Sequence, residues 1–544
     1  MDYFVGVDVG TGSVRAALVD LQGKILETAV EPTVTYNPQA SFYEQSSNNI
    51  WTSISHVVKK VVASVPKSSI KGIGFDATCS LVAIGKNGLP VTVSPTGLDD
   101  QNIILWMDHR ASEQAHFINK LGHKLLKYVG GKVSLEMEIP KLLWLKQNLP
   151  ETWKRTELFF DLPDFLTWKA TGCESRSLCS LVCKWNYSAG PNITNNWCFD
   201  YLEEIGLSDL AADNYRKIGQ IVKSPGSPVG NGLSRKSAEE LNLLEGTPVG
   251  ASIIDAHAGG LGMLGCSAND ISSDFTTRLG LICGTSTCHM AVSKEEIFVN
   301  GVWGPYYDAM VPGFWLNEGG QSTTGKLLDH VIDSHPATLE IKKKLGPKQH
   351  VQEYISNLLK TLAESQKLNN VAYLTKNLHV WPDFHGNRSP LADPSLHGMI
   401  CGLTLSTDEE SLAKLYLATM QSLTYGTKHI IEALTAAGHN IKSLLICGGL
   451  TKNHLFIQTQ ADVLGLPVLL PAEKESVLLG SAILGACAAQ TFSSVNDAIK
   501  KMGGSAIVVH PTPETFSYHE KKYRVFKKMV DDQNQYKEYM RETL

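Results

Sequence analysis

The chain has 544 residues, which is more than one compact core usually holds, so we expect two or more structural units. Hydrophobic residues make up 43% of the sequence and charged residues 19%, which excludes a disordered chain. The net charge of −5 offers no overall attraction to nucleic acid or to an anionic membrane. We therefore expect a folded protein whose partners are small molecules, and the sequence leaves its oligomeric state open.

The N-terminal segment, MDYFVGVDVG, lacks the basic region and apolar stretch of a secretory signal. No run of about 18 apolar residues occurs, so we expect no membrane span. The eleven cysteines form no CxxC pair, which is typical of a reducing compartment, and we expect a cytoplasmic protein. Four cysteines lie close together, but their spacing lacks the paired knuckles of a zinc site; they are Cys173, Cys179, Cys183 and Cys198.

In the first half of the chain, the pattern begins with three strands joined by short turns. Apolar runs and turn residues predict strands at 3–9, 14–20 and 25–30. Helical periodicity then alternates with further strands. The expected helices cover 48–64 and 111–127, and the expected strands cover 70–77 and 248–255.

The second half repeats this arrangement. Two strands joined by a Gly-rich turn are expected at 279–283 and 288–292. They are followed by helices at 408–437, up to 461 and at 475–489, with strands at 443–447 and 467–470. The repetition predicts an α/β protein with two similar domains, 1–268 and 269–490, and a helical extension over 491–544.

Two Gly-rich turns occupy corresponding positions in the predicted domains. The first contains Gly10, Thr11, Gly12 and Ser13, and the second contains Gly284, Thr285 and Ser286. Backbone N–H groups and hydroxyls in such tight turns can converge on an anion. Two turns in matching places therefore predict a cleft in which both domains hold one polyphosphate.

Three charged residues accompany these turns, and each has an alternative structural role. Asp8 precedes the first turn and suits hydrated Mg²⁺, or it caps the turn. Arg15 either approaches the transferred phosphate or lies on the hairpin surface. Asp255 ends an apolar strand, where its carboxylate could orient an attacking hydroxyl, or it caps the following helix.

The segment ICGGLTKN joins a predicted strand to a helix through Gly448 and Gly449, with Asn453 at its end. Glycines at this junction allow a flat base or a ribose to approach the backbone closely. A purely structural turn is the alternative.

Together these segments resemble the FGGY carbohydrate kinases, which are built on the duplicated actin/hexokinase-like (ribonuclease H-like) ATPase fold with a central cleft. GVDVGTGSVRAALVD is similar to the first phosphate segment of the family, ICGTSTCHM to the second and CGGLTKNHLFIQTQADVLGLPV to the adenosine segment. The resemblance covers roughly residues 3–490. It implies ATP and Mg²⁺ as cofactors.

Further segments resemble the ribulokinase branch of that family; they include FDATCSLV, LWMDHRA, GGKVSLEMEIPK, NEGGQS and DFHGNRSP. The resemblance implies that Asp255 is the general base and that Asp8 and Asp255 lie near magnesium. The implied ketopentose site contains Cys79, Lys184 and Glu318, with Asp108 and His109 as further contacts. The implied reaction converts D-ribulose to D-ribulose 5-phosphate. The alternatives are a kinase of L-ribulose, ribitol or xylulose, and a non-catalytic, nucleotide-gated interaction protein on the same fold.

Overall fold

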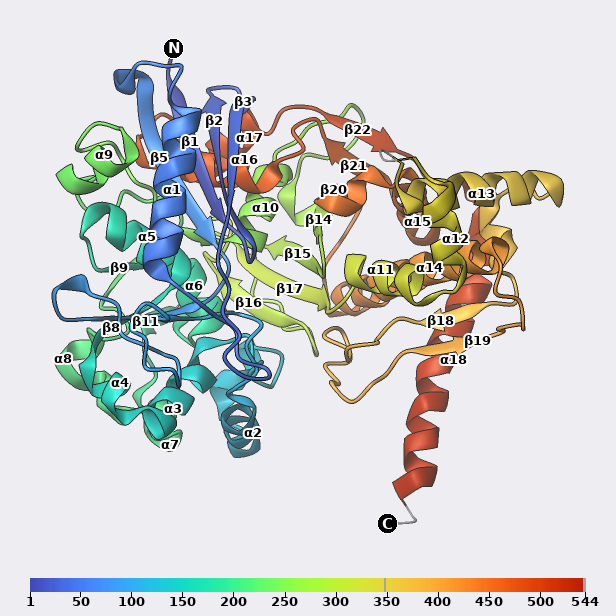
Figure 1. The fold of residues 1–544 in the computed structure, drawn as a ribbon, viewed down its shortest axis with the longest axis horizontal. Coiled ribbons are helices and arrows are strands. Elements are labelled where there is room, and N and C mark those ends of the chain that lie inside the picture. The colour runs from blue at the N-terminus through green and yellow to red at the C-terminus, as the bar shows by residue number, and fades with distance from the viewer. Residues whose placement is uncertain (347–348, 542–544) are drawn as a thin grey trace.

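The computed structural model describes residues 1–346 and 349–541, and two large β-sheets organise it (Figure 1). The first sheet has the order β13-β5-β1-β2-β3. Its strands are β1 (Tyr3–Val9), β2 (Ser13–Asp20), β3 (Ile25–Pro32), β5 (Ile70–Ala77) and β13 (Ile253–Ile254).

The second sheet has the order β16-β17-β15-β14-β20-β21-β22. Its strands are β14 (Arg278–Cys283), β15 (Thr287–Ser293), β16 (Trp303–Tyr307), β17 (Trp315–Gln321), β20 (Ser443–Cys447), β21 (Val468–Pro471) and β22 (Ala506–Val509). In both sheets the first strand of the meander pairs antiparallel with the second and parallel with a later strand. The order β21-β20-β14-β15-β17 therefore repeats the order of the first sheet, strand for strand.

Burial explains why β1 is almost continuously apolar. Phe4, Val5, Val7 and Val9 are fully buried because helices cover both faces of the first sheet. On one face lies α1 (Ser47–Val61), whose N-terminus is capped by the Ser46 side chain accepting from the Asn49 N–H group. On the other face lies α16 (Ser476–Ala488), which comes from the C-terminal half of the chain.

Helix α16 also crosses α10 (Asp255–Leu264) at the centre of the molecule. Both contacts depend on glycine, because backbones approach too closely for a side chain. A Cβ atom on Gly74 would lie 1.9 Å from the Ser481 carbonyl oxygen, and one on Gly480 would lie 2.0 Å from that of Ala258. Through α16, the C-terminal half of the chain is packed tightly against the first sheet.

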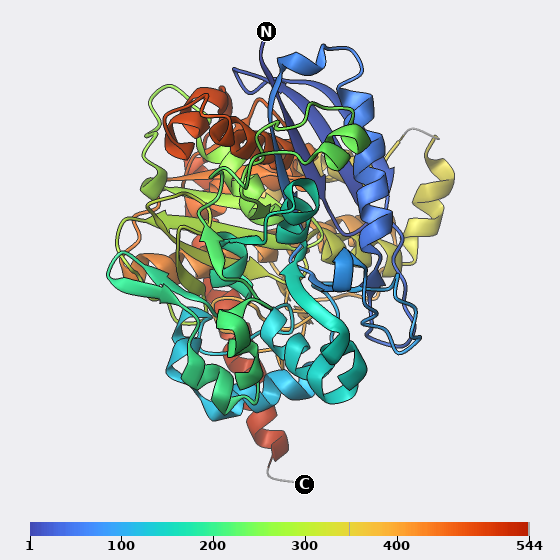
Figure 2. The same cartoon turned by 90° about the vertical axis from the view of Figure 1, so that its left-hand side faces the viewer.

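A smaller sheet, ordered β4-β7-β6-β8, lies below the first sheet in Figures 1 and 2 together with several helices. Its strands are β4 (Glu44–Gln45), β6 (Leu81–Gly85), β7 (Ile103–Ile104) and β8 (Thr156–Asp161). The accompanying helices are α2 (Ser112–Leu121), α3 (Glu138–Asn148), α4 (Pro150–Arg155), α5 (Leu162–Thr171) and α6 (Leu178–Lys184). This region supplies one side of the candidate site.

In the C-terminal half, the main helices are α11 (Gly325–Ser334), α13 (Val351–Ser365), α14 (Glu409–Ala437), α15 (His454–Leu464), α17 (Val495–Met502) and α18 (Phe516–Arg541). The last of these extends away from the body of the molecule toward the C-terminus (Figure 1). No helix in the described ranges has the length and apolarity needed to cross a membrane.

Three expected elements differ from those observed. The extension expected to be helical over 491–544 also contains the strand β22, which pairs with β21 at the edge of the second sheet. The helix expected over 111–127 is interrupted at Gly122, whose φ of 66° is left-handed, and a short 3₁₀ helix (Lys124–Tyr128) follows. The strand expected over 248–255 is reduced to β13, because Val249 forms only an isolated bridge with Ile73. The bounds expected for β5 and β20 agree with the structure.

Candidate active site

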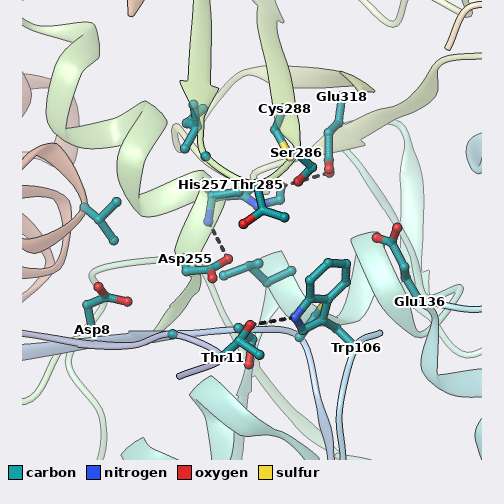
Figure 3. A pocket seen from close by; sticks show the side chains of 18 of the residues that line it. Asp8, Thr11, Trp106, Glu136, Asp255, His257, Thr285, Ser286, Cys288 and Glu318 are labelled. Carbon is teal, nitrogen blue, oxygen red and sulfur yellow. Dashed lines mark hydrogen bonds and ion pairs between the residues drawn. The ribbon is translucent and has the colours of Figure 1, made fainter. Parts of the chain in front are cut away.

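The two Gly-rich turns line one cavity between the large sheets. The first turn contributes Gly10 and Thr11, and the second contributes residues 284–286. Figure 3 shows Thr11 and Thr285 facing the same space. Thr11 is held by the Trp106 indole, whose Nε1 donates to Thr11 Oγ1 over 2.9 Å. The structure therefore brings together the two turns that the sequence analysis paired as a phosphate cradle.

Asp255 lies at the centre of this cavity, immediately after β13. It is the first residue of α10, and its carboxylate accepts only from the adjacent Ala256 N–H group among the described residues. Burial, together with the negative charge of Asp8, raises the pKa of Asp255 to about 7. The side chain is thus directed toward the cavity and titrates near neutrality.

Two further carboxylates adjoin Asp255. Asp8 and Asp76 occupy paired positions on the parallel strands β1 and β5. Burial, reinforced by Asp8, raises the pKa of Asp76 well above its usual range, and the Ser481 hydroxyl donates to this carboxyl group. Asp8 accepts from Arg15 Nε over 2.8 Å, and Arg15 also contacts Glu475 over 2.6 Å. Arg15 therefore lines the cavity, where it joins the first turn to the segment before α16.

The opposite end of the cavity is lined by buried charged groups. Lys184 ends α6 and lies 4.5 Å from the centre of the Trp303 ring. Its ammonium group has no hydrogen-bond or ion-pair partner among the described residues. Glu318, on β17, accepts from Arg388 Nη2 over 2.7 Å. Burial raises the pKa of Glu318, but Lys184 and Arg388 outweigh this effect, and the net shift is downward.

Cys79 and Glu136 complete this end of the cavity. Burial raises the pKa of the Cys79 thiol well above its usual range, so the thiol stays neutral. Glu136 lies 3.8 Å from Arg388 Nη2. The cavity thus has a carboxylate-rich end near the first turn and a mixed-charge end around Lys184.

Several predicted residues do not line the cavity. The Asp108 carboxylate is occupied by Arg110 and by the Tyr43 N–H group, and the His109 ring stacks 6.4 Å from that of His385. Gly12 and Ser13 belong to the first turn but are not among the residues that line the cavity. An internal ion pair and a backbone N–H group occupy the oxygens of Asp108, and sugar contacts by Asp108 and His109 stay a prediction.

The predicted adenosine segment lies beside the second turn but outside the cavity. Gly448 has a φ of 93°, and a Cβ atom there would lie 2.4 Å from the Cys283 carbonyl oxygen. Asn453 caps α15 by accepting from the Phe456 N–H group. Gly449 has open space around its Cα atom. Gly448 and Asn453 therefore have clear structural roles, and nucleotide binding by all three residues stays a prediction.

Sequence reasoning missed several cavity residues, although most lie in segments already singled out. Arg388 is in DFHGNRSP, Glu136 in GGKVSLEMEIPK, and Trp106 in LWMDHRA. His257 follows Asp255 by two residues and also lines the cavity. The resemblance to the kinase family identified the right segments, but the sequence does not say which of their side chains point into the cavity.

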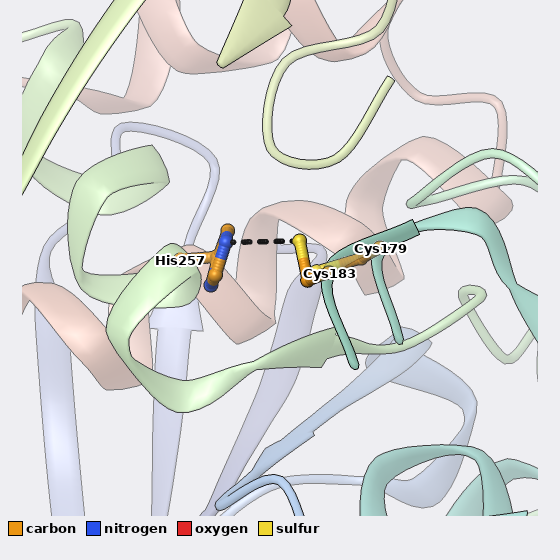
Figure 4. A group of neighbouring side chains, drawn as sticks. All are labelled: Cys179, Cys183 and His257. Atoms are coloured by element: carbon orange, nitrogen blue, oxygen red, sulfur yellow. Dashed lines mark hydrogen bonds between the residues drawn. The ribbon is translucent and has the colours of Figure 1, made fainter. Parts of the chain in front are cut away.

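His257 lies close to two buried cysteines, Cys179 and Cys183 (Figure 4). Cys179 and Cys183 lie one turn apart on α6, and Cys183 Sγ is 3.5 Å from His257 Nε2. Burial raises the pKa of the Cys183 thiol well above its usual range and lowers that of His257 to about 4. A protonated thiol beside a neutral imidazole is the stable pairing here. Cys173 and Cys198 do not join this group.

Comparisons with known proteins bear on the whole chain. Residues 3–262 match the N-terminal domain of the FGGY family of carbohydrate kinases, and residues 279–489 match its C-terminal domain. The boundary that we place between residues 268 and 269 stays a prediction.

Two relatives illustrate the similarity. An FGGY carbohydrate kinase domain-containing protein from Homo sapiens is 53% identical, over 98% of this chain and 97% of its own. A D-ribulokinase from Saccharomyces cerevisiae is 41% identical, over 90% of this chain and 72% of its own.

A solved structure supports the fold. The xylulose kinase from Rhodospirillum rubrum superposes with a TM-score of 0.77 at 19% identity, covering 98% of this chain and 99% of that one. Together with the repeated sheets, this likeness confirms the expected α/β fold of two actin-like halves. The chain belongs to the FGGY family of carbohydrate kinases.

Proposed function

We propose that this carbohydrate kinase transfers the γ-phosphoryl group of ATP to the C5 hydroxyl of D-ribulose. The observation that carries the proposal is the position of Asp255, which shares one cavity with both Gly-rich turns and with the Lys184 and Glu318 side chains. A phosphate donor and a polyhydroxyl acceptor can therefore meet beside one carboxylate.

In the proposed reaction, Asp255 accepts the proton of the attacking hydroxyl. The hydroxyl oxygen forms a bond to the γ-phosphorus, and the bond from that phosphorus to the leaving ADP oxygen breaks. A base with a pKa of about 7 is half ionised at neutral pH and suits proton transfer there. The N–H groups and hydroxyls of residues 10–11 and 284–286 would hold the phosphates.

The carboxylate-rich end of the cavity suits Mg²⁺. Asp8 and Asp255 supply the hard oxygen ligands that this ion prefers. The pKa of Asp255 is raised by burial and, to a smaller extent, by the negative charge of Asp8, which a cation would compensate. When bound, Mg²⁺ would neutralise charge on the phosphate oxygens. We propose that Asp8 and Asp255 hold the ion, with Arg15 beside them.

The other end of the cavity suits a ketopentose. Among the described residues, the Lys184 ammonium group is a buried donor without a hydrogen-bond or ion-pair partner. Glu318 Oε2 is a buried acceptor without a hydrogen bond there, 3.6 Å from His257 Nε2. Hydroxyl and carbonyl oxygens of an open-chain sugar would satisfy both, and leaving such groups unpaired is costly. The D-ribulokinase relative supports D-ribulose in particular.

A coupled ADP-release screen tests this proposal. D-Ribulose, L-ribulose, D-xylulose and ribitol are each supplied with ATP and Mg²⁺, and the Asp255→Asn variant serves as the control. We expect the highest kcat/KM with D-ribulose and little turnover by the variant. A higher kcat/KM with another of these sugars would overturn the assignment of D-ribulose. Turnover of none of them would overturn the proposed function.

A further inference from the structure

The segment between β18 (His379–Trp381) and β19 (Met399–Cys401) belongs to the C-terminal half but reaches the sugar end of the cavity. We call residues 382–398 the Arg388 loop. Internal hydrogen bonds fix its shape: Asn387 donates to Asp383 over 2.8 Å, and its side-chain oxygen accepts from the Leu391 N–H group over 2.9 Å. These hydrogen bonds therefore give the loop a defined conformation, in which Arg388 lines the cavity.

Arg388 is almost enclosed, with a side chain 11% exposed. Its guanidinium carbon lies 4.1 Å from the centre of the Trp303 ring, and Nη2 lies 2.7 Å from Glu318 Oε1. The same nitrogen is 3.8 Å from Glu136, which belongs to the N-terminal half. Arg388 thus connects the two halves where the sugar is proposed to bind.

Glu318 depends on this contact because it is a buried anion. Its side chain is 2% exposed, and Oε2 has no hydrogen-bond partner among the described residues. A buried carboxylate needs a compensating charge and a donor that fixes its orientation. Arg388 provides both at Oε1, whereas Oε2 lies 3.6 Å from His257 Nε2, beyond hydrogen-bonding distance. The hydrogen-bonding capacity of Oε2 is therefore unused among the described residues.

The Arg388 loop is in turn attached to the C-terminal helix α18. Gln533 forms a two-way pair with the His397 backbone: its amide donates to the carbonyl oxygen and its Oε1 accepts from the N–H group, each over 2.8 Å. At the other end of the loop, the Trp381 ring lies 4.4 Å from that of Phe526 on α18. Both ends of the loop are therefore held by the C-terminal extension.

We propose that Arg388 is a positioning residue that orients Glu318 toward the sugar, and that α18 supports sugar binding by holding the Arg388 loop. The proposal rests on the proposed function, because it concerns the acceptor end of that same site. It also assigns a role to the C-terminal extension, which lies outside the two matched family domains.

Steady-state kinetics of Arg388→Met and Arg388→Lys test the first part. We expect Arg388→Met to raise the KM for D-ribulose about 10-fold to 100-fold, with the KM for ATP unchanged and a smaller effect on kcat, since an ion-paired hydrogen bond is lost. Arg388→Lys should raise the KM for D-ribulose less than Arg388→Met does, because lysine returns the positive charge without the planar guanidinium group. Arg155→Met, which neutralises an exposed arginine, is the control.

A double-mutant cycle with Glu318→Gln measures whether the effects of the two residues on the sugar KM are coupled. A general loss of stability would not produce such coupling. If Arg388 acts through Glu318, the double variant should be no worse than Glu318→Gln alone. Additive increases in KM, or an unchanged KM in Arg388→Met, would overturn the proposal. Melting temperatures identify any variant that fails to fold, and for such a variant Arg388→Lys gives the decisive comparison.

The helix is tested by Gln533→Ala, with Gln535→Ala as a matched control on the same helix. Gln535 is exposed, and its amide donates to the Tyr539 hydroxyl of the same helix over 2.7 Å. We expect Gln533→Ala to raise the sugar KM about two-fold to ten-fold, since two neutral hydrogen bonds are lost, and Gln535→Ala to have no effect. Equal KM values for the two variants would overturn the role of α18.

These failures are distinguishable from failure of the proposed function. Wild-type protein that turns over no ketopentose refutes the function itself, whereas wild-type turnover with unchanged variants refutes only this inference. If the wild-type protein prefers another sugar of the screen, the same comparison is made with that sugar.

Discussion

Replacing Asp255 with asparagine should abolish activity and yet stabilise the folded protein. The catalytic loss follows from removing the proposed base, which typically contributes 10²-fold to 10⁴-fold in kcat. The gain in stability follows from electrostatics. Burial and the neighbouring Asp8 raise the pKa of Asp255 from 3.8 to about 7, so folding opposes ionisation of this group.

The magnitude follows from that shift. About three pKa units correspond to about 4 kcal/mol at most, because each unit is worth about 1.4 kcal/mol and water in the cavity reduces the penalty. The sign is fixed by linkage: the folded state binds the proton more tightly, so wild-type stability falls as pH rises from about 4 to about 7. The stabilisation by Asp255→Asn should therefore be largest above pH 7 and small near pH 4.

Urea denaturation of both proteins at several pH values, without Mg²⁺ or nucleotide, measures this difference. We expect the advantage of the variant to grow across that interval and then to level off. A pH-independent difference, or a variant less stable at pH 8, would refute the electrostatic reasoning. If the folded Asp255→Asn variant turned over substrate at the wild-type rate, Asp255 could not be the catalytic base.

Three further changes test other parts of the site and the fold. Lys184→Met should raise the KM for the sugar at least about ten-fold while the KM for ATP is unchanged, because a buried donor is lost; equal shifts in both constants would contradict this role. Asp8→Asn should raise the Mg²⁺ concentration needed for half-maximal activity about ten-fold, and an unchanged midpoint would exclude Asp8 as a ligand. Gly74→Ala should lower the unfolding free energy by about 2 kcal/mol or more, since the new Cβ would lie 1.9 Å from the Ser481 carbonyl oxygen, whereas Gly12→Ala meets nothing within 4 Å. Equal urea midpoints for the two glycine variants would contradict the packing of α16.

The sequence was most informative where one local pattern determines one element. The apolar run of β5 and the long periodic segment of α14 were predicted closely because each is bounded by clear turn or capping residues. The strand over 248–255 was overestimated, since Val249 and Ala251 are buried but only Ile253 and Ile254 pair with β5 in a continuous ladder. Periodicity reports burial, and burial alone does not specify pairing.

The candidate site was only partly predictable for a related reason. Asp255 and the paired turns lie at strand ends, where chain direction alone places them at a cleft. Arg388 and Glu318 are 70 residues apart, and their contact depends on how a long loop folds back. Asp108 lies in a singled-out segment but is neutralised by its near neighbour Arg110. Spacing cannot distinguish an internal ion pair from a ligand contact.

The central claim is that a phosphoryl group passes to a terminal sugar hydroxyl in the cavity beside Asp255. The most direct measurement is ³¹P NMR of the products formed from ATP and D-ribulose by the wild-type protein and by Asp255→Asn. The claim predicts ADP and a new phosphomonoester signal split by the two C5 protons with the wild-type protein, and neither with the variant. Inorganic phosphate as the only new product, or the same ester from the variant, would contradict it.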